Sequence, residues 1–163
     1  MSELPRLLAL DRIGPHGASL TVEANLVERA AIAVRLMIPA VPMLRCVYQV
    51  RRIEAGILAA DGVLEAEAEQ ICVLSLDPFV QWIKESFTIH FVPAGEEDKE
   101  PEPDAVDQIP YATSAIDLGE AAIEQLALAL DPYPRKPGAA LPVELEAPSG
   151  PFAALSQIKP RLR

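Results

Sequence analysis

Aromatic residues are scarce in this chain of 163 residues: Phe, Trp and Tyr together make up 5% of it, although 50% of its residues are hydrophobic. The core is therefore built from Ala, Leu, Val and Ile, which suits close packing better than the stacking of nucleic-acid bases. No apolar run approaches the roughly 20 residues that cross a bilayer, and the opening MSELPRLLALDR lacks the pattern of a secretory signal. We expect a soluble, cytoplasmic protein without membrane contact.

Cysteine is rarer still, with two residues. Cys46 and Cys72 are too few for a disulfide scaffold and too far apart in sequence for a paired metal site. Both fall within apolar, strand-like patterns, so we expect buried free thiols. A glycine-rich phosphate-binding loop is also missing, because IGPHGA has neither the lysine nor the spacing of such a motif. The sequence predicts no cofactor and no small-molecule substrate.

The charge of the chain is distributed unevenly around a net value of −10. Residues 1–53 hold seven Arg and four acids, residues 54–131 hold two Lys and eighteen acids, and residues 132–163 hold five bases and two acids. The three regions therefore carry +3, −16 and +3. An acidic middle of this size favours a basic partner, whereas the two basic ends favour phosphate groups.

Seven acids crowd into GEEDKEPEPDAVD, residues 95–107. Like charges, proline and few apolar side chains are typical of a solvated loop, since such a segment buries too little apolar surface to offset its ordering. We interpret residues 95–110 as a flexible acidic loop within a single domain of residues 1–163, followed by a basic tail at 151–163. A spacer that only aids solubility is the alternative reading of the loop.

Hydrophobic alternation predicts three successive strands. The first is PMLRCVYQVRR, the second is VLEAEAEQICVLSLDP and the third is IKESFTIHFVP. The inward positions of these strands are Leu44, Cys46, Tyr48 and Val50; Leu64, Ala66, Ala68, Cys72, Leu74 and Leu76; and Ile83, Phe87, Ile89 and Phe91. Asp61-Gly62, within AADGV, is typical of a two-residue hairpin turn and is expected to join the first strand to the second. Two earlier strands, LPRLLALDRI and ASLTVEANL, flank the turn GPHG.

Two helices are predicted from caps and apolar spacing. The first begins at Asn25, with Glu28 in the capping-box position, and its core stripe is expected to be Val27, Ala30, Ala31, Val34 and Ile38. The second begins after Asp117, with Glu120 three residues later, and its stripe is Ile123, Leu126, Ala127 and Leu130. Pro132 ends it near Asp131. Together these elements predict an α+β fold, in which two or three helices pack on a mainly antiparallel sheet of about five strands.

The segment after the second helix, DPYPRKPGA, places an acid at the negative end of the helix dipole. Such a placement is unfavourable by about 0.3–1 kcal/mol unless a cation lies nearby. We therefore expect Asp131 to pair with Arg135 or Lys136, which would hold this segment as a rigid, exposed basic knob.

Several stretches together resemble the YceD family of bacterial proteins, which also has plant organellar relatives. They are GVLEAEAEQICVLSLDPFVQWIKESFTIHFVP, IDLGEAAIEQLALALDPYPRKPGA, PFAALSQIKP and the upstream VEANLVERAAIAVRLMI with its Glu28-Arg29 pair. The resemblance implies a role in the accumulation of large-subunit ribosomal RNA and hence in ribosome biogenesis, and it implies no catalytic residues. Many members carry cysteines after the second helix; DPYPRKPGAALP has none, so we predict no metal there.

A carboxylate-based enzyme is the weakest reading, because no histidine accompanies Asp117, Glu120 and Glu124 in sequence. Two non-catalytic functions stay open. The first is a ribosome biogenesis factor that supports accumulation of large-subunit ribosomal RNA by binding protein, ribosomal RNA or both, and the second is an acidic module or chaperone that binds a basic ribosomal protein without direct RNA contact. The candidate binding residues are Arg51, Arg52, Asp117, Glu124, Gln125, Arg135, Lys136, Lys159 and Arg161.

Overall fold

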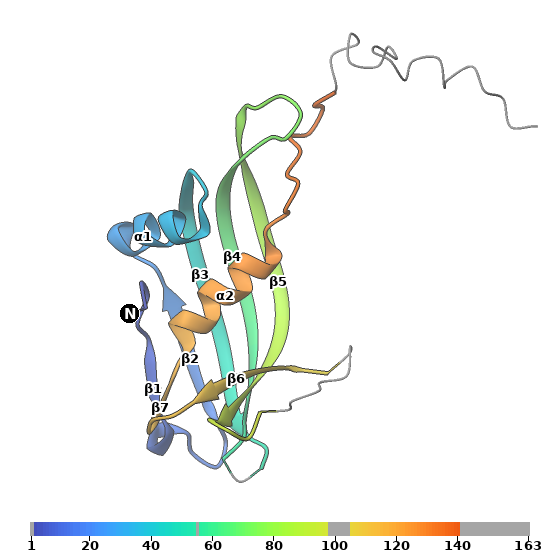
Figure 1. Cartoon of the computed structure of the whole chain (residues 1–163). Coiled ribbons are helices and arrows are strands. Elements are labelled where there is room, and N and C mark those ends of the chain that lie inside the picture. The colour runs from blue at the N-terminus through green and yellow to red at the C-terminus, as the bar shows by residue number, and fades with distance from the viewer. Residues whose placement is uncertain (1, 55, 98–104, 141–163) are drawn as a thin grey trace, which may run out of the picture.

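The computed structural model describes residues 2–54, 56–97 and 105–140. Its main element is a five-stranded sheet in the order β2-β3-β4-β5-β6 (Figure 1). Strands β2 (Ala18–Glu23), β3 (Ala40–Arg52), β4 (Leu58–Ile71) and β5 (Pro78–Pro93) pair antiparallel, and β6 (Asp107–Tyr111) runs parallel to β5. The predicted α+β class with a mainly antiparallel sheet is confirmed.

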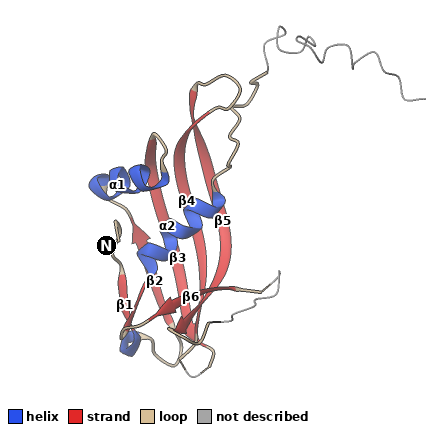
Figure 2. Cartoon of the chain, viewed as in Figure 1, coloured by secondary structure: helices blue, strands red, loops and turns tan. Residues whose placement is uncertain are grey.

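A second, two-stranded sheet pairs β1 (Leu7–Ala9) with β7 (Ala115–Asp117), and a 3-10 turn, η1 (Leu10–Arg12), follows β1. Helix α1 (Leu26–Leu36) connects β2 to β3, and helix α2 (Leu118–Ala129) crosses one face of the large sheet (Figure 2). We call the face under α2 the inner face and the opposite one the outer face. Of the two strands predicted before the meander, ASLTVEANL contains β2 of the large sheet, whereas LPRLLALDRI contains β1 of the small sheet.

The three-stranded meander β3-β4-β5 is confirmed, and so is most of its inward set. Leu44, Cys46, Tyr48 and Val50 are buried on β3, and Leu64, Ala66 and Ala68 are buried on β4. On β5, Ile83, Ile89 and Phe91 are buried and Phe87 is half-buried. Alternation works here because α2 and the small sheet cover only one face, so that every second side chain enters the core.

The expected hairpin turn at Asp61-Gly62 is wrong, because both residues lie inside β4. The chain turns at residues 53–57 instead, where the Ile53 amide donates to the Ile57 carbonyl at 3.1 Å and Gly56 adopts a φ of 83°. Gly62 serves cross-strand packing, since a Cβ at this position would lie 2.2 Å from Cζ of Phe87. The glycine leaves room for an aromatic ring from the neighbouring strand, a role that local turn statistics do not reveal.

The inward set at the end of β4 stops earlier than predicted. Cys72 is buried as expected, but Leu76 lies 75% exposed in the turn before β5, with a φ of 60°. The predicted acidic loop also needs correction at its end, because Asp107–Tyr111 forms β6 beside β5. Residues 98–104 of that loop lie outside the described part of the chain.

Helix α1 begins with the predicted capping box: the Asn25 side chain accepts from the Glu28 amide at 3.0 Å, and the Glu28 carboxylate accepts from the Asn25 amide at 2.7 Å. Its predicted core stripe is wrong. Ile32 and Ala33 are the buried residues, whereas Val27 and Val34 are 77% and 79% exposed. Ala30 is exposed too, and Ala31 and Ile38 are half-buried.

Helix α2 also starts as predicted, with the Asp117 carboxylate accepting from the amides of Gly119 and Glu120 at 3.0 and 3.2 Å. The same oxygen accepts from the Arg6 amide at 3.0 Å, which ties the N-terminal segment to the helix. Within the predicted stripe, Ile123 and Leu126 are buried and Leu130 is half-buried, but Ala127 is exposed. The helix ends at Ala129, close to the expected position.

Candidate binding surfaces

The outer face of the sheet carries a network of ion pairs. Arg45 contacts Glu23 at 3.1 Å and Glu65 at 3.6 Å, and Lys84 contacts Glu65 at 2.9 Å. Farther along β3, Arg51 pairs with Asp61 at 2.7 Å. The alternation of β3, β4 and β5 places these side chains on one face, and antiparallel pairing brings opposite charges together. The cations of this face are therefore already engaged by carboxylates.

Two acids on the same face are not engaged in this way. Glu67 and Glu69, near the end of β4, form no ion pair with any described residue. Glu67 lies opposite Trp82 in the β4–β5 register, and Glu69 lies opposite Val80. The side chains of directly opposed residues sit about 5 Å apart at their Cβ atoms. Each carboxylate therefore adjoins an exposed apolar group.

We call this region the tryptophan patch and define it as Met43, Glu67, Glu69, Val80 and Trp82. Val80 is 55% exposed and Trp82, the only tryptophan of the chain, is 54% exposed. An indole face attracts lysine and arginine through its quadrupole, and carboxylates accept charge-assisted hydrogen bonds from the same cations. The two carboxylates repel phosphates, whereas Arg135 lines a hollow together with Val80 and Trp82.

The candidate arginines at one end of the sheet make intramolecular contacts. Arg51 pairs with Asp61, and Arg52 donates from Nη2 to the Leu10 carbonyl at 2.6 Å. Both side chains belong to exposed residues. A ligand phosphate at Arg51 would compete with an existing carboxylate partner, which lowers the gain from binding there.

The candidate cations after α2 lie at the other end of the sheet, and the expected latch is wrong. The Asp131 carboxylate accepts from the Tyr133 amide at 2.8 Å, which makes a local turn, and its carbonyl accepts from Gln70 Nε2 at 3.1 Å. Lys136 instead pairs with Asp77 at 3.6 Å. Within the described ranges Asp131 pairs with neither Arg135 nor Lys136. The Tyr133 amide and the buried Gln70 side chain therefore supply hydrogen bonds to Asp131 at the end of the helix, and no cation is needed there.

The two basic groups are therefore separated by the length of β4. Arg52 pairs with Leu58 at the start of that strand, whereas the Pro134 carbonyl accepts from the Val73 amide just beyond its end. Fourteen strand residues at about 3.3 Å each span roughly 45 Å. The structure does not bring Arg51 and Arg52 together with Arg135 and Lys136. The remaining candidates, Lys159 and Arg161, lie outside the described residues.

The acids of α2 have structural partners or partial burial. Asp117 caps the helix, and Glu120 pairs with Arg35 of α1, which lowers the pKa of Glu120 below its ordinary value. Burial, followed by the charge of Glu120, raises the pKa of Glu124. Gln125 lines a shallow hollow between α2 and β5. The two glutamates therefore have different environments: Glu120 is held in an ion pair with Arg35, whereas Glu124 is partly buried.

Both cysteines are buried and free, as expected. Burial raises the pKa of Cys46 to about 11, whereas hydrogen bonds from Ser75 lower the pKa of Cys72 to about 6. Neither thiol is accessible to solvent. In the described part of the chain, no group of three or more His, Cys, Asp or Glu residues could hold a metal ion, and no helix is long and apolar enough to cross a membrane.

The structure is thus an α+β domain whose outer face is partly ion-paired and carries an acidic, tryptophan-containing patch. The chain matches the family model described as "Large ribosomal RNA subunit accumulation protein YceD" over residues 60–159. This match covers more than half of the 163 residues, and the chain belongs to the YceD family. No curated protein and no solved structure matches it.

Family membership confirms the resemblance and implies a role in the accumulation of the large ribosomal RNA subunit. The family is related to ribosome biogenesis and has no known catalysis. The matched range begins within β4, so the similarity of residues 1–59 to the family stays a prediction.

Sequence reasoning missed the tryptophan patch, although its signals are visible. Glu67 and Glu69 belong to the predicted polar face of a strand, and Trp82 precedes the predicted inward position Ile83. What could not be read from the chain is the register that sets Glu67 opposite Trp82. That register follows from a turn at residues 72–77 and from packing on the inner face.

Proposed function

We propose that this protein is a non-catalytic assembly factor for the large ribosomal subunit that binds a basic ribosomal protein or assembly factor through the tryptophan patch. The observation that supports this most directly is the pairing of two unengaged carboxylates, Glu67 and Glu69, with the exposed side chains of Trp82 and Val80. RNA contact is secondary and is made by Arg135, Lys136, Lys159 and Arg161 within the joint complex.

The net charge supports a protein-first order of assembly. A chain of charge −10 is repelled by RNA at long range but attracted by a basic protein, and complementary charge raises association rates by about 10- to 1000-fold at low salt. The acids of residues 95–107 contribute to that field. The patch adds short-range recognition, because cation–π contacts and charge-assisted hydrogen bonds require a defined geometry.

Direct binding of ribosomal RNA is the second candidate, and it rests on the basic residues at both ends of the chain. Several of them are occupied: Arg51 and Lys136 have carboxylate partners, and Arg52 bonds a backbone carbonyl. An RNA site would have to displace these contacts or use cations beyond them. A steep fall of RNA affinity with salt is its signature.

The single tryptophan lies in the proposed site, so its fluorescence reports binding directly. Purified basic large-subunit proteins are titrated into the wild type and into Glu67→Gln/Glu69→Gln. We expect the double variant to bind the cognate protein about 10-fold or more weakly, because each lost charge-assisted contact weakens binding by roughly 10-fold. Trp82→Ala, followed by calorimetry, should lose a similar factor.

Asp11→Asn/Glu54→Gln is the matched control. It removes the same amount of charge from two exposed residues near the opposite end of the sheet. It should change affinity less than about threefold, since only the screened long-range field is altered. An equal loss of affinity in both double variants would mean that the patch contributes only its net charge and no specific contact. Tight binding of large-subunit RNA alone, with no binding of basic proteins, would favour the RNA candidate.

A further inference from the structure

Helix α1 buries one apolar face and exposes another. Ile32 and Ala33 lie in the core, while four apolar side chains of the helix and its C-cap point to solvent. Leu26, Val27, Val34 and Met37 are 74%, 77%, 79% and 91% exposed, respectively. Single exposed apolar residues are ordinary, but a set that follows one helix and adjoins a groove marks an interaction surface.

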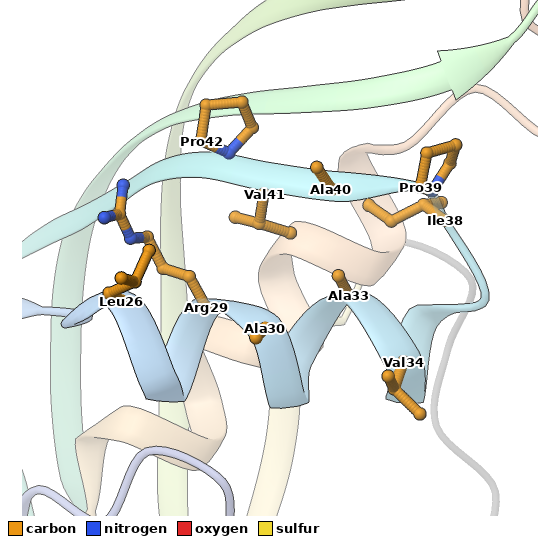
Figure 3. A pocket seen from close by; sticks show the side chains of 10 residues that line it. All are labelled: Leu26, Arg29, Ala30, Ala33, Val34, Ile38, Pro39, Ala40, Val41 and Pro42. Carbon is orange, nitrogen blue, oxygen red and sulfur yellow. The ribbon is translucent and has the colours of Figure 1, made fainter.

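The groove lies between α1 and the start of β3 and has a volume of about 440 Å³. Figure 3 shows Ala33 and Ile38 facing the strand and Val34 pointing away from it, with Ala30 between Leu26 and Val34 along the helix. We call it the α1 groove; its lining residues are Leu26, Arg29, Ala30, Ala33, Val34, Ile38, Pro39, Ala40, Val41 and Pro42. Leu26, Ala30 and Val34 follow at four-residue spacing, so they form one ridge along which a second helix can lie. The small side chain of Ala30 permits close approach.

Arg29 is the charged residue of the lining. Its side chain extends from α1 toward β3 at the Leu26 end of the groove (Figure 3). Its Nε is buried and has no hydrogen-bond partner, and Arg29 forms no ion pair within the described residues. Arg29 is half-buried, and its guanidinium has no counter-charge among the described residues, so an occupant of the groove that supplies one gains a charge-assisted hydrogen bond. The complementary group is a carboxylate.

A second copy of the chain does not meet this requirement. The exposed face of α1 holds Leu26, Val27, Ala30, Val34 and Met37, and none of these is an acid. Two copies packed through this face would leave both Arg29 side chains without an acceptor from it. Two molecules of net charge −10 also repel each other. The groove therefore fits a segment of another protein.

We propose that the α1 groove binds an amphipathic helix of a partner protein, whose apolar stripe packs on Leu26, Ala30 and Val34 and whose acidic side chain pairs with Arg29. This surface is distinct from the tryptophan patch, which fits a basic segment. The two surfaces adjoin where Ala40 of the groove lies opposite Glu69 of the patch, but they select opposite charge, and the proposal stands independently of the function proposed above.

The test uses a labelled synthetic helix of about 16 residues. It carries Leu at helical i, i+4, i+7 and i+11 positions and one Glu beside the stripe; a matched peptide carries Gln in place of that Glu. Fluorescence anisotropy measures the binding of both peptides to the full chain. Val34→Lys should weaken binding of the Glu peptide by about 10-fold or more, because it places a charge in the apolar contact.

A double-mutant cycle isolates the proposed ion pair. Arg29→Gln should weaken the Glu peptide about fivefold and leave the Gln peptide within about twofold, as a direct charge pair requires. Leu128→Lys is the matched control, because Leu128 is 70% exposed on α2 and outside the groove. Circular dichroism checks that each variant is folded. Equal binding by wild type, Val34→Lys and Leu128→Lys, or equal effects of Arg29→Gln on both peptides, would overturn the proposal.

A photo-crosslinking residue in place of Met37, 91% exposed at the end of α1, identifies the natural occupant in cells. The crosslinked peptide, sequenced by mass spectrometry, should come from another protein and combine an apolar helical stripe with an Asp or Glu beside it. A crosslink to residues 141–163 of the same chain or to a second copy would refute the proposed occupant. So would a crosslink to a segment without an acid.

Discussion

Arg35 of α1 and Glu120 of α2, 85 positions apart in the sequence, form a bidentate ion pair. Nη1 of the guanidinium donates to Oε2 of the carboxylate, and Nη2 donates to Oε1. The Nη1–Oε2 distance is 3.0 Å, and the same Nη1 lies 2.8 Å from Glu3 Oε2. One arginine thus joins the N-terminal segment and both helices. Because one arginine serves both carboxylates, only one long cationic side chain loses conformational entropy when the three elements are joined.

Glu120→Gln should destabilise the protein at neutral pH by about 1 kcal/mol or less, since the pair is partly exposed. Arg35 lowers the pKa of Glu120, so the carboxylate contributes stability above its unfolded pKa and loses it as pH falls through the folded value. Urea unfolding at pH 7 and at pH 3 checks this. The difference between wild type and variant should be present at pH 7 and smaller at pH 3; an equal difference at both would mean that the charge is not involved.

Glu124→Gln, one helical turn later, should act in the opposite direction. Burial and the charge of Glu120 raise the pKa of Glu124 in the folded state, so ionisation at neutral pH opposes folding. The variant should gain a few tenths of a kcal/mol at pH 7 after screening by solvent, and nothing below the unfolded pKa. Thermal melts across a pH series measure the effect. A loss of stability at pH 7 would show that Glu124 accepts a stabilising contact in its charged form.

Gly62→Ala should destabilise the sheet by about 1–3 kcal/mol through overpacking. The new Cβ would lie 2.2 Å from Cζ of Phe87, whose ring packs edge-on against Tyr48 with centroids 5.8 Å apart. Denaturant unfolding gives the cost. In a Phe87→Leu background the same substitution should cost less than half as much, because the ring that blocks the Cβ is gone. An unchanged cost would place its origin in the backbone.

Asn25→Ala should lower stability by about 0.5–2 kcal/mol, the usual cost of losing an N-cap. The Asn25 side chain accepts from the amides of Val27 and Glu28 at 2.9 and 3.0 Å, and alanine leaves both donors to water. Asn25→Asp is the matched control and should stay within about 0.5 kcal/mol, since aspartate caps equally well. Chemical denaturation compares the three proteins. A neutral result for Asn25→Ala would mean that Arg6–Glu28 and Arg35–Glu120 contacts alone hold the helix.

Local patterns predicted much of the fold because local physics decides it. Alternation identified the buried side chains of β3, β4 and β5, and capping residues identified the starts of both helices, with Asn25 and Asp117 in the expected roles. The face of α1 was wrong for an equally physical reason. The helix carries apolar residues on several of its faces. Their spacing alone therefore does not show whether the face with Ile32 or the face with Val34 packs on the core.

Predictions that depended on distant partners failed or stayed open. The local sequence of Asp61-Gly62 predicts a turn. In the structure both residues lie in β4, where the register with β5 places them opposite Thr88 and Phe87. Asp131 reads as half of a latch until Gln70, 61 positions earlier, is found bonding its carbonyl. The sequence does not say whether the candidate basic residues meet, and the structure places Arg52 and Lys136 at opposite ends of the sheet.

The sequence by itself determined the α+β class, the acidic character, the helix starts and the family, because each follows from composition, from short-range spacing or from motifs carried along the chain. Only the tertiary structure decided which carboxylates are left without cations and which apolar side chains stay in water. Strand register set Glu67 beside Trp82, and the docking of Ile32 turned Val34 outward. Both outcomes depend on contacts between residues far apart in the chain, whose geometry no local pattern specifies.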